Sequence, residues 1–353
     1  MSPAPLPVFD GHNDVLLRLH MLPGEPERAF LEGRGSGHLD LPRMRAGGFA
    51  GGLFAIFVPS LEEGPGADAL MEGATYDIPL PPELEPTRAQ RATVHMASIL
   101  FRIERASAGR VKVCRSVADI RACMEADVLA TVLHVEGAEA IDPDFHMLDV
   151  LYGAGLRSLG PVWSRPNLFG DGVPFRFPSS PDIGGGLTDL GRELVRRCNR
   201  LNILVDLSHL TEQGFWDVAK VTDAPLVASH SNAHAVCPHS RNLTDRQLAA
   251  IRESGGLAGV NLATGFLRDD GRRDADTPLA DVVRHVDHLV EHLGIEGVGI
   301  GSDFDGATVP APIADAAGLP KLIDALRQRG YDEPSLRKIA HENWLRVLER
   351  TWA

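Results

Sequence analysis

Residues 7–18 read PVFDGHNDVLLR. The apolar residues Val8 and Phe9 are followed at once by a polar cluster, in which His12 and Asp14 stand two positions apart. Because side chains alternate between the two faces of a strand, His12 and Asp14 would point the same way. A short apolar run that ends in a histidine and a carboxylate is typical of a buried parallel strand whose C-terminal end lies at a reactive site. The recurrence of this pattern along the chain decides the fold.

Eight short apolar runs can be recognised, and most are followed by a turn and a segment of helical periodicity. They are VFDGHND from residue 8, GGLFAIFV from 51, VLATVLHVEG from 128, LRSLGPVW from 156, NILVDLSH from 202, PLVASHS from 225, GGLAGVNL from 255 and GVGIGSDFDG from 297. Helices are predicted over residues 93–106, 188–200, 244–253, 279–293 and 333–350. Eight β/α units predict a (β/α)8 TIM barrel of the α/β class, forming a single domain over residues 1–353. A doubly wound open sheet is the alternative, but the count of eight and the polar residues at the strand ends favour closure.

Composition excludes several classes of protein. The chain has 353 residues, 44% of them hydrophobic, which is enough for a large core. Its net charge of −13 is spread without a basic patch, so no nucleic-acid partner is expected. Neither a long apolar stretch nor a charged leader is recognisable, so a cytoplasmic protein without membrane contact is expected. The four cysteines form no CxxC pair and are expected to be reduced; a homo-oligomer is compatible with all of this.

The ends of the predicted strands carry metal-binding residue types. Glu136 ends the third run, and His209 and His230 end the fifth and sixth, which are neighbouring strands. Each alone is readily explained as a salt-bridged acid or a packed histidine. Together with His12 and Asp14 they make three imidazoles and two carboxylates, too many for one tetrahedral zinc and suitable for two divalent metal ions that share a carboxylate. Zinc is the expected ion, although manganese, cobalt or iron would accept the same donors.

Three further strand ends supply candidates for catalysis and substrate binding. Asp303 and Asp305 follow the eighth run; Asp303 lies nearer the strand end and is the predicted general base and acid, while Asp305 is expected to brace the loop. Trp163 ends the fourth run and Asn261 the seventh, so both are predicted to contact the substrate.

These residues resemble the membrane (renal) dipeptidase family of zinc metallopeptidases, within the amidohydrolase superfamily. The resemblance covers nearly the whole chain and is carried by DGHND at 10–14, VEGAEAI at 135–141, LDVLYGAGLR at 148–157, GLTDLGRELVRRCNRLNILVDLSH at 186–209, SHSNAHAVCPHSRNL at 229–243 and GIGSDFDG at 299–306. It implies that Glu136 bridges two zinc ions, one also held by His12 and Asp14 and the other by His209 and His230. It also implies that Asp303 is the acid/base and that Arg241 binds the carboxylate of the substrate.

One position departs from the family pattern. Where the family commonly has a histidine that contacts the substrate carbonyl oxygen, this chain has Trp163. An indole donates one hydrogen bond but is never a cation. The contact would therefore be lost, taken over by Arg165 in the following loop, or left to the metal.

The predicted function is hydrolysis of free dipeptides, including L-Xaa-D-Xaa, through a hydroxide that bridges two metal ions. Another amidohydrolase activity, on N-acyl-D-amino acids, cyclic amides or lactones, is the first alternative. Arg241 discriminates among the candidate substrates, because an arginine there favours an anionic substrate terminus. A binding protein that keeps the metals without turnover is the second. The presence of Asp303 argues against that, since metal binding alone does not need this acid.

Overall fold

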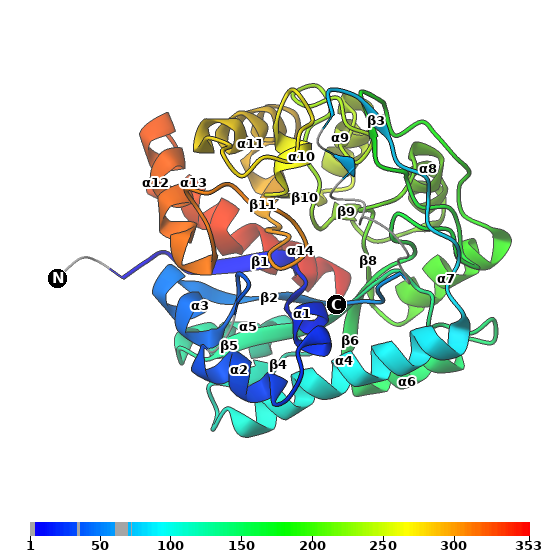
Figure 1. Ribbon diagram of the computed structural model, residues 1–353, viewed down its shortest axis with the longest axis horizontal. Coiled ribbons are helices and arrows are strands. Elements are labelled where there is room, and N and C mark those ends of the chain that lie inside the picture. The colour runs from blue at the N-terminus through cyan, green and yellow to red at the C-terminus, as the bar shows by residue number, and fades with distance from the viewer. Residues whose placement is uncertain (1–3, 34–35, 61–69, 72) are drawn as a thin grey trace.

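Eight parallel strands form a nearly closed barrel in the computed structural model, which describes residues 4–33, 36–60, 70–71 and 73–353 (Figure 1). The barrel strands are β1 (Val8–Asn13), β2 (Phe49–Phe57), β5 (Leu129–Glu136), β6 (Leu156–Gly160), β8 (Leu204–Val205), β9 (Val227–Ala228), β10 (Leu257–Val260) and β11 (Val298–Ile300). Their order is β8-β6-β5-β2-β1-β11-β10-β9. An isolated parallel bridge between Asp206 and Val227 links the two outer strands of this order. All eight predicted runs thus form barrel strands, and the predicted TIM barrel is confirmed.

The strands form because their residues are buried on both faces. In β5 all eight residues are buried, and seven of them precede the terminal Glu136. The register pairs Phe57 of β2 with Glu136, so the two strands end together. The ladders of β8 and β9 are only two residues long, shorter than the predicted runs. The strand pairing of β8 and β9 ends after these two residues, and the non-strand segments that follow contain His209 and His230.

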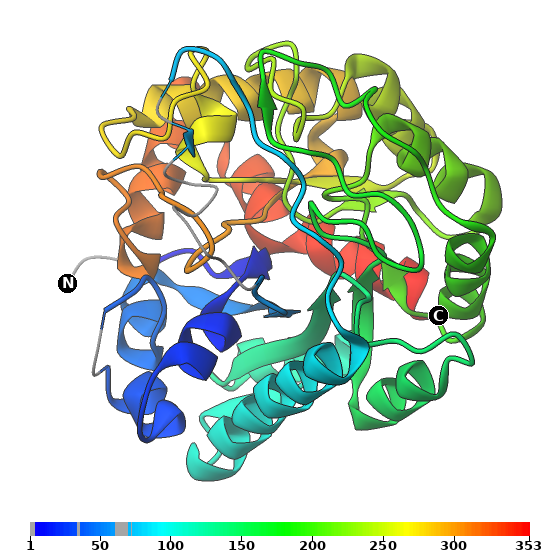
Figure 2. The same cartoon turned by 45° about the vertical axis from the view of Figure 1, so that its right-hand side comes forward.

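Helices surround the barrel (Figure 2). They are α1 (Val15–Met21), α2 (Pro26–Glu32), α3 (Leu41–Gly47), α4 (Pro86–Ala106), α5 (Val117–Glu125), α6 (His146–Ala154), α7 (Asp189–Arg200), α8 (Glu212–Val221), α9 (Asp245–Glu253), α10 (Thr264–Leu267), α11 (Leu279–Leu293), α12 (Leu319–Arg329), α13 (Glu333–Arg337) and α14 (Asn343–Thr351), with short 3-10 or π turns at Ile295–Gly297, Ala316–Gly318 and Lys338–Glu342. The hydroxyls of Thr188 and Thr244 cap α7 and α9 by accepting from backbone N–H groups. The predicted helix over 333–350 is divided by the π turn into α13 and α14.

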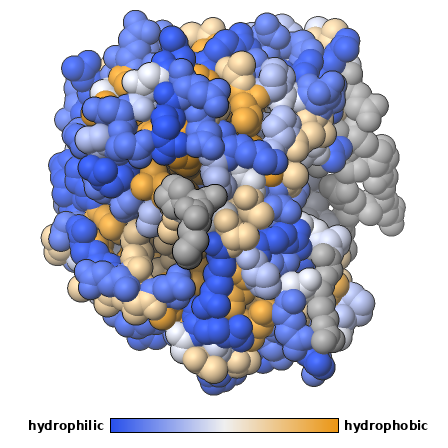
Figure 3. All heavy atoms as spheres, turned by 90° about the vertical axis from the view of Figure 1, so that its left-hand side faces the viewer, coloured by the Kyte–Doolittle hydropathy of each residue, from blue (hydrophilic) through white to orange (hydrophobic). Residues whose placement is uncertain are grey.

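Three further strands lie outside the barrel ring. Strand β4 (Val111–Val113) pairs with β5, and β3 (Tyr76–Asp77) pairs with β7 (Arg176–Phe177) in a small antiparallel sheet. The four cysteines are buried, and none of them forms a disulfide bond. In the described part of the chain, the helices are too short or too polar to cross a membrane. The face drawn in Figure 3 mixes hydrophilic and apolar residues.

Candidate metal centre

Five side chains from four strands converge at the C-terminal end of the barrel. They are the predicted ligands, His12 and Asp14 from β1 and its end, Glu136 from the end of β5, and His209 and His230 from the segments after β8 and β9. Each has an exposed fraction of 5% or less. The structure therefore brings all five together, as expected for residues at the same end of parallel strands.

Glu136 lies between two groups of donors. Its Oε2 lies 3.6 Å from His12 Nε2, which is also 3.3 Å from Asp14 Oδ2. Its Oε1 lies 3.0 Å from His209 Nε2 and 3.5 Å from His230 Nε2. The two imidazole nitrogens of this second group are 3.1 Å apart. One oxygen of Glu136 thus faces each group, which is the arrangement that a carboxylate shared by two cations requires.

Neighbouring hydroxyls orient two of the histidines. Ser229 Oγ lies 2.7 Å from His230 Nδ1 and donates to the carboxylate of Asp206. Because that hydroxyl proton is directed at Asp206, His230 Nδ1 is the donor to Ser229, and Nε2 keeps a lone pair for the cluster. Ser164 Oγ lies 2.8 Å from His209 Nδ1 and contacts the outer nitrogen of that ring. Such partners on the outer nitrogen are typical of metal-ligating histidines.

The electrostatics of the cluster also favour cations. Burial lowers the pKa of His209 and His230 well below the usual value, so both are neutral, the form that binds metals. Burial alone would lower the pKa of His12 too, but the charges of Glu136 and Asp14 raise it to about 10. A buried imidazole that holds a proton so firmly marks a strongly negative potential, which divalent cations would neutralise. The residues present therefore fit a pair of divalent metal ions.

Asp303 stands beside this cluster in the loop after β11. Its carboxylate belongs to a group with His12 and Asp14 in which the potential ligand atoms lie within 4.8 Å of one another. Burial raises its pKa to about 6. Asn261 Nδ2 donates to Asp303 Oδ2 at 2.9 Å, so the carboxylate is fixed in direction. Asp303 and His209 have positive φ angles of 59° and 67°, a costly conformation that is common at functional sites.

Asp305 has a different surrounding. Its Oδ2 accepts from Arg18 Nε at 2.9 Å, and its Oδ1 accepts from the backbone N–H of His38. These bonds tie the loop after β11 to helix α1, through Arg18, and to the segment that follows α2, through His38. The predicted bracing role of Asp305 is confirmed.

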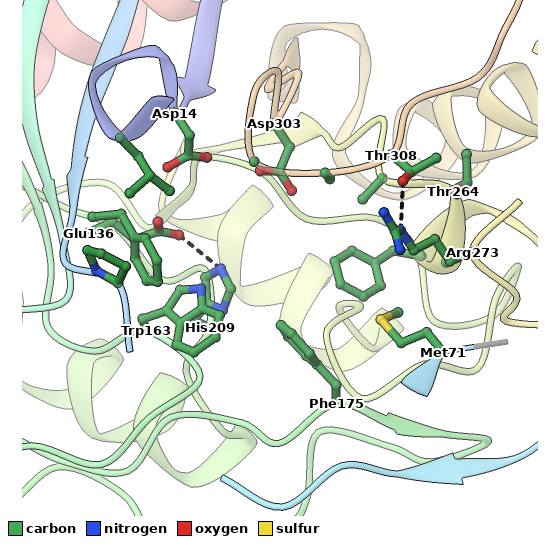
Figure 4. A pocket seen from close by; sticks show the side chains of 18 of the residues that line it. Asp14, Met71, Glu136, Trp163, Phe175, His209, Thr264, Arg273, Asp303 and Thr308 are labelled. Carbon is green, nitrogen blue, oxygen red and sulfur yellow. Dashed lines mark hydrogen bonds and ion pairs between the residues drawn. The ribbon is translucent and has the colours of Figure 1, made fainter. Parts of the chain in front are cut away.

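A cavity of about 450 Å³ opens in front of the cluster (Figure 4). Asp14, Glu136, His209 and Asp303 form its polar wall. Much of the remaining lining is apolar or aromatic: Leu17, Met21, Phe57, Met71, Trp163, Phe175 and Phe266. Trp163 lies with its ring 5.7 Å from that of His209, so it lines the cavity next to the cluster. Asn261 contacts Asp303 and is not among the described residues of the lining.

The two arginines considered from the sequence are both buried. Arg165 is fully buried, and its guanidinium donates to Glu139 Oε1 at 2.7 and 3.0 Å, to the Val58 carbonyl and to Ser60. Arg165 is thus committed to a structural ion pair and does not replace the missing histidine as a substrate contact. The sequence could not reveal this, because the partners of Arg165 come from distant strands.

Arg241 lies behind the cavity wall. Its Nη2 donates to the His230 carbonyl at 3.0 Å and its Nη1 to Ser231 Oγ at 3.3 Å. The guanidinium carbon is 5.4 Å from the centre of the Phe266 ring, which does line the cavity. Within the described residues, Arg241 Nε has no hydrogen-bond partner although it is buried. A buried donor of this kind is costly unless another acceptor satisfies it.

A polar group on the far side of the cavity was not predicted from the sequence. Arg273, Thr264 and Thr308 lie there, together with Met71 (Figure 4). Arg273 belongs to the stretch DDGRRDAD, which has no strand or helix periodicity and offered no signal. Only the three-dimensional path of this loop places Arg273 in the cavity.

Two solved structures of metallo peptidases match nearly the whole chain. A metallo peptidase from Rhodobacter sphaeroides, solved with a phosphinate mimic of the dipeptide L-Ala-D-Ala, matches with a TM-score of 0.97 and 57% identity, covering 99% of this chain and 100% of that one. A second structure, described as dipeptidase AC, a metallo peptidase of family M19, matches with a TM-score of 0.96 and 58% identity, covering 98% of this chain and 99% of that one.

Comparison of sequences leads to the same group of proteins. The family described as membrane dipeptidase (peptidase family M19) matches residues 4–352. A curated relative from Klebsiella pneumoniae, described as an uncharacterized protein in the pqqA 5′ region, is 52% identical over 255 residues, which are 72% of this chain and 94% of the relative.

Proposed function

The chain belongs to the membrane dipeptidase family, peptidase family M19, and on this premise we propose that it cleaves free dipeptides, including those of the L-Xaa-D-Xaa type, with two divalent cations. As a member of this family it is a metal-dependent dipeptidase, a hydrolase of peptide bonds. The Rhodobacter sphaeroides relative, 57% identical, binds a mimic of L-Ala-D-Ala, and this supports the stereochemistry proposed for the substrate.

The position of Glu136 is the observation that carries the two-cation proposal. One of its oxygens faces His12 and the other faces His209 and His230, at 3.0 to 3.6 Å. We assign one cation to His12, Asp14 and Glu136, and the other to Glu136, His209 and His230. Zinc is the ion proposed, because neutral imidazole and carboxylate together suit it. When bound, the cations would supply a water molecule of lowered pKa and polarise the scissile carbonyl.

The residues of the chain would orient the reactants and move the proton. Asp303, directed by the Asn261 amide, would accept a proton from the attacking water and return it to the leaving amine. The aromatic wall formed by Trp163, Phe175 and Phe266 would exclude water from the bound dipeptide. Trp163 would contribute apolar surface to this wall. It would not act as a cationic donor, because an indole does not carry the positive charge of a protonated histidine.

Arg241 is proposed to bind the C-terminal carboxylate of the substrate. The donor would be its Nε, which has no hydrogen-bond partner among the described residues, or its Nη groups after they leave the His230 carbonyl and Ser231. Arg241→Ala is then expected to lower kcat/KM for L-Ala-D-Ala by roughly thirtyfold, equivalent to about 2 kcal/mol, the low end for loss of a buried charge pair. The smaller cost is expected because Arg241 also donates to the His230 carbonyl and to Ser231, so its guanidinium is not devoted to the substrate alone. Initial rates with L-Ala-D-Ala and with its C-terminal amide would be compared.

The amide provides the control for this experiment. It lacks the terminal charge, so the wild-type enzyme should hydrolyse it poorly and Arg241→Ala should change that rate little. Equal losses on the free dipeptide and on the amide would mean that Arg241 only supports the segment that carries His230. In that case the restriction to dipeptides would need another cause.

A further inference from the structure

A second group of metal-binding side chains lies outside the barrel, between α9 and α11 (Figure 1). Asp245 is the first residue of α9, and His288 and His292 lie on α11. Each offers one ligand atom, and the three atoms lie within 4.8 Å of one another. These residues are not among the described residues of the cavity lining. The proposed catalytic scheme therefore leaves the group without a role.

The two histidines share one face of α11. They stand four positions apart, about one helical turn, and their rings stack with centroids 4.3 Å apart. Both Nε2 atoms face the same oxygen, because Asp245 Oδ1 lies 2.7 Å from His288 Nε2 and 3.9 Å from His292 Nε2. Two histidines at this spacing are the arrangement by which a helix binds zinc through two imidazoles. The group thus has the donors of a cation site with three protein ligands.

The start of α9 sets the position of Asp245. The hydroxyl of Thr244 caps this helix by accepting from a backbone N–H. The neighbouring Arg246 is directed away from Asp245, with its guanidinium 4.5 Å from the centre of the Trp216 ring and 3.8 Å from a carboxylate oxygen of Glu212. Within the described residues, the basic side chains that approach Asp245 to 4.0 Å or less are the two histidines. The carboxylate is therefore held against imidazoles and is not neutralised by an arginine.

An ordinary contact between two helices would use fewer of these groups. One imidazole is sufficient to bond to Asp245, and His288 does so at 2.7 Å. His292 adds no second hydrogen bond, since its Nε2 is 3.9 Å from that oxygen. Two protonated imidazoles stacked at this distance would also repel each other. A divalent cation avoids the repulsion, because two neutral rings and one carboxylate can share it.

The exposure and the donor types indicate which cation would bind. The side chains of His288, His292 and Asp245 are 17%, 31% and 50% exposed, so a cation can enter from solvent and keep water on its remaining positions. Two imidazoles favour zinc, copper or nickel over magnesium and calcium, which prefer oxygen ligands. Exposure also weakens the attraction of the carboxylate. Such an ion would be held less tightly than at the buried centre and would be lost on dialysis.

A cation at this position would join two elements that support the active site. Helix α9 begins directly after residues 229–244, the segment that carries His230 and Arg241. Helix α11 contacts the same segment, because His285 Nδ1 accepts from the Ala233 N–H at 3.1 Å. An ion bound between the two helices would stabilise this part of the folded chain without touching the reacting groups.

We propose that Asp245, His288 and His292 form a peripheral site for a divalent transition-metal ion such as zinc, which stabilises the fold and takes no part in hydrolysis. The site is additional to the two cations assigned to Glu136 and its neighbours. Its occupancy does not depend on which bond the enzyme cleaves. The inference therefore stands or falls separately from the proposed function.

The test measures binding of Zn²⁺ to the dialysed, metal-loaded enzyme by isothermal titration calorimetry at neutral pH. The wild type should bind one ion more per chain than His292→Ala, whatever number the catalytic centre retains. Loss of this ligand should weaken the peripheral site by at least about tenfold, as for loss of a group that supports a metal site. His288→Ala and Asp245→Asn should have the same effect, and Mg²⁺ should not bind there.

Glu291→Gln is the matched control. Glu291 is exposed on the same helix, and its replacement removes a negative charge without removing a proposed ligand. Added Zn²⁺ should raise the Tm of the wild type and of Glu291→Gln by about 2 °C or more and leave that of His292→Ala unchanged. The rate of His292→Ala on L-Ala-D-Ala should equal that of the wild type.

Four results would overturn the inference. The wild type could bind no additional Zn²⁺, or His292→Ala could bind it equally well, which would place the ion elsewhere. Equal binding of Mg²⁺ would indicate general attraction to an acidic surface. Binding without a rise in Tm would remove the stabilising role. A wild type that shows the additional ion but hydrolyses no dipeptide would support this site and contradict only the proposed function.

Discussion

Replacement of Asp303 by asparagine is expected to lower kcat by roughly two to four orders of magnitude, the usual contribution of a positioned acid/base. Asparagine has the same shape but takes up no proton from water and returns none to the leaving amine. Its side-chain oxygen can still accept from Asn261, so the fold and KM should change little. Steady-state kinetics on L-Ala-D-Ala, with the metal content of each preparation measured, would test this.

Asp305→Asn is the matched control for this substitution. Asp305 lies two positions further along the same loop and is bonded to Arg18 and to the His38 backbone, outside the cavity. Its replacement should lower the free energy of unfolding while kcat remains close to that of the wild type. If Asp303→Asn keeps a near-normal kcat with full metal content, Asp303 is not the acid/base.

Replacement of Glu136 by glutamine is expected to weaken both cation sites together. Each oxygen of Glu136 faces one group of ligands, so the lost charge is shared. Removing one partner of a buried charge pair costs about 2 to 5 kcal/mol, which would weaken the binding of each cation by roughly 30- to 5,000-fold. Elemental analysis after dialysis should therefore find about two ions per chain in the wild type and fewer than about one in Glu136→Gln, as shared ligation requires.

Glu139→Gln is the control for Glu136→Gln. Glu139 is equally buried and lies three positions further along, but it binds Arg165 and not the cluster. The folded variant should keep about two ions, since none of the proposed ligands is changed. If Glu136→Gln loses only one ion and binds the other with unchanged affinity, Glu136 is not shared between the sites.

The barrel and the convergence of the ligands could be predicted because both follow from local patterns. The apolar runs have the length of buried strands, and residues at the C-terminal ends of parallel strands must meet at one end of a barrel. His12, Glu136 and His230 therefore came together although they are far apart in the chain. The long-range contacts could not be predicted. The ion pair of Arg165 with Glu139 and the path that carries Arg273 into the cavity depend on how loops pack against each other, which residue periodicity does not encode.

Helix boundaries illustrate the same limit. Residues 279–293 form α11 as predicted, because their apolar face repeats at helical spacing over the whole segment. The predicted helix over 333–350 contains a π turn at Lys338–Glu342. The turn precedes Trp344, whose buried indole donates to the Ile300 carbonyl at 2.9 Å. A tertiary contact of this kind can alter local winding without changing the apolar pattern.

The most direct test of the central claim is a comparison of initial rates of the metal-loaded protein on L-Ala-D-Ala, L-Ala-L-Ala and N-acetyl-D-alanine. The cation cluster, the position of Asp303 and the family membership together predict hydrolysis of the free dipeptides, L-Ala-D-Ala included, and little or none of N-acetyl-D-alanine. Activity confined to N-acetyl-D-alanine, with no cleavage of either dipeptide, would contradict it.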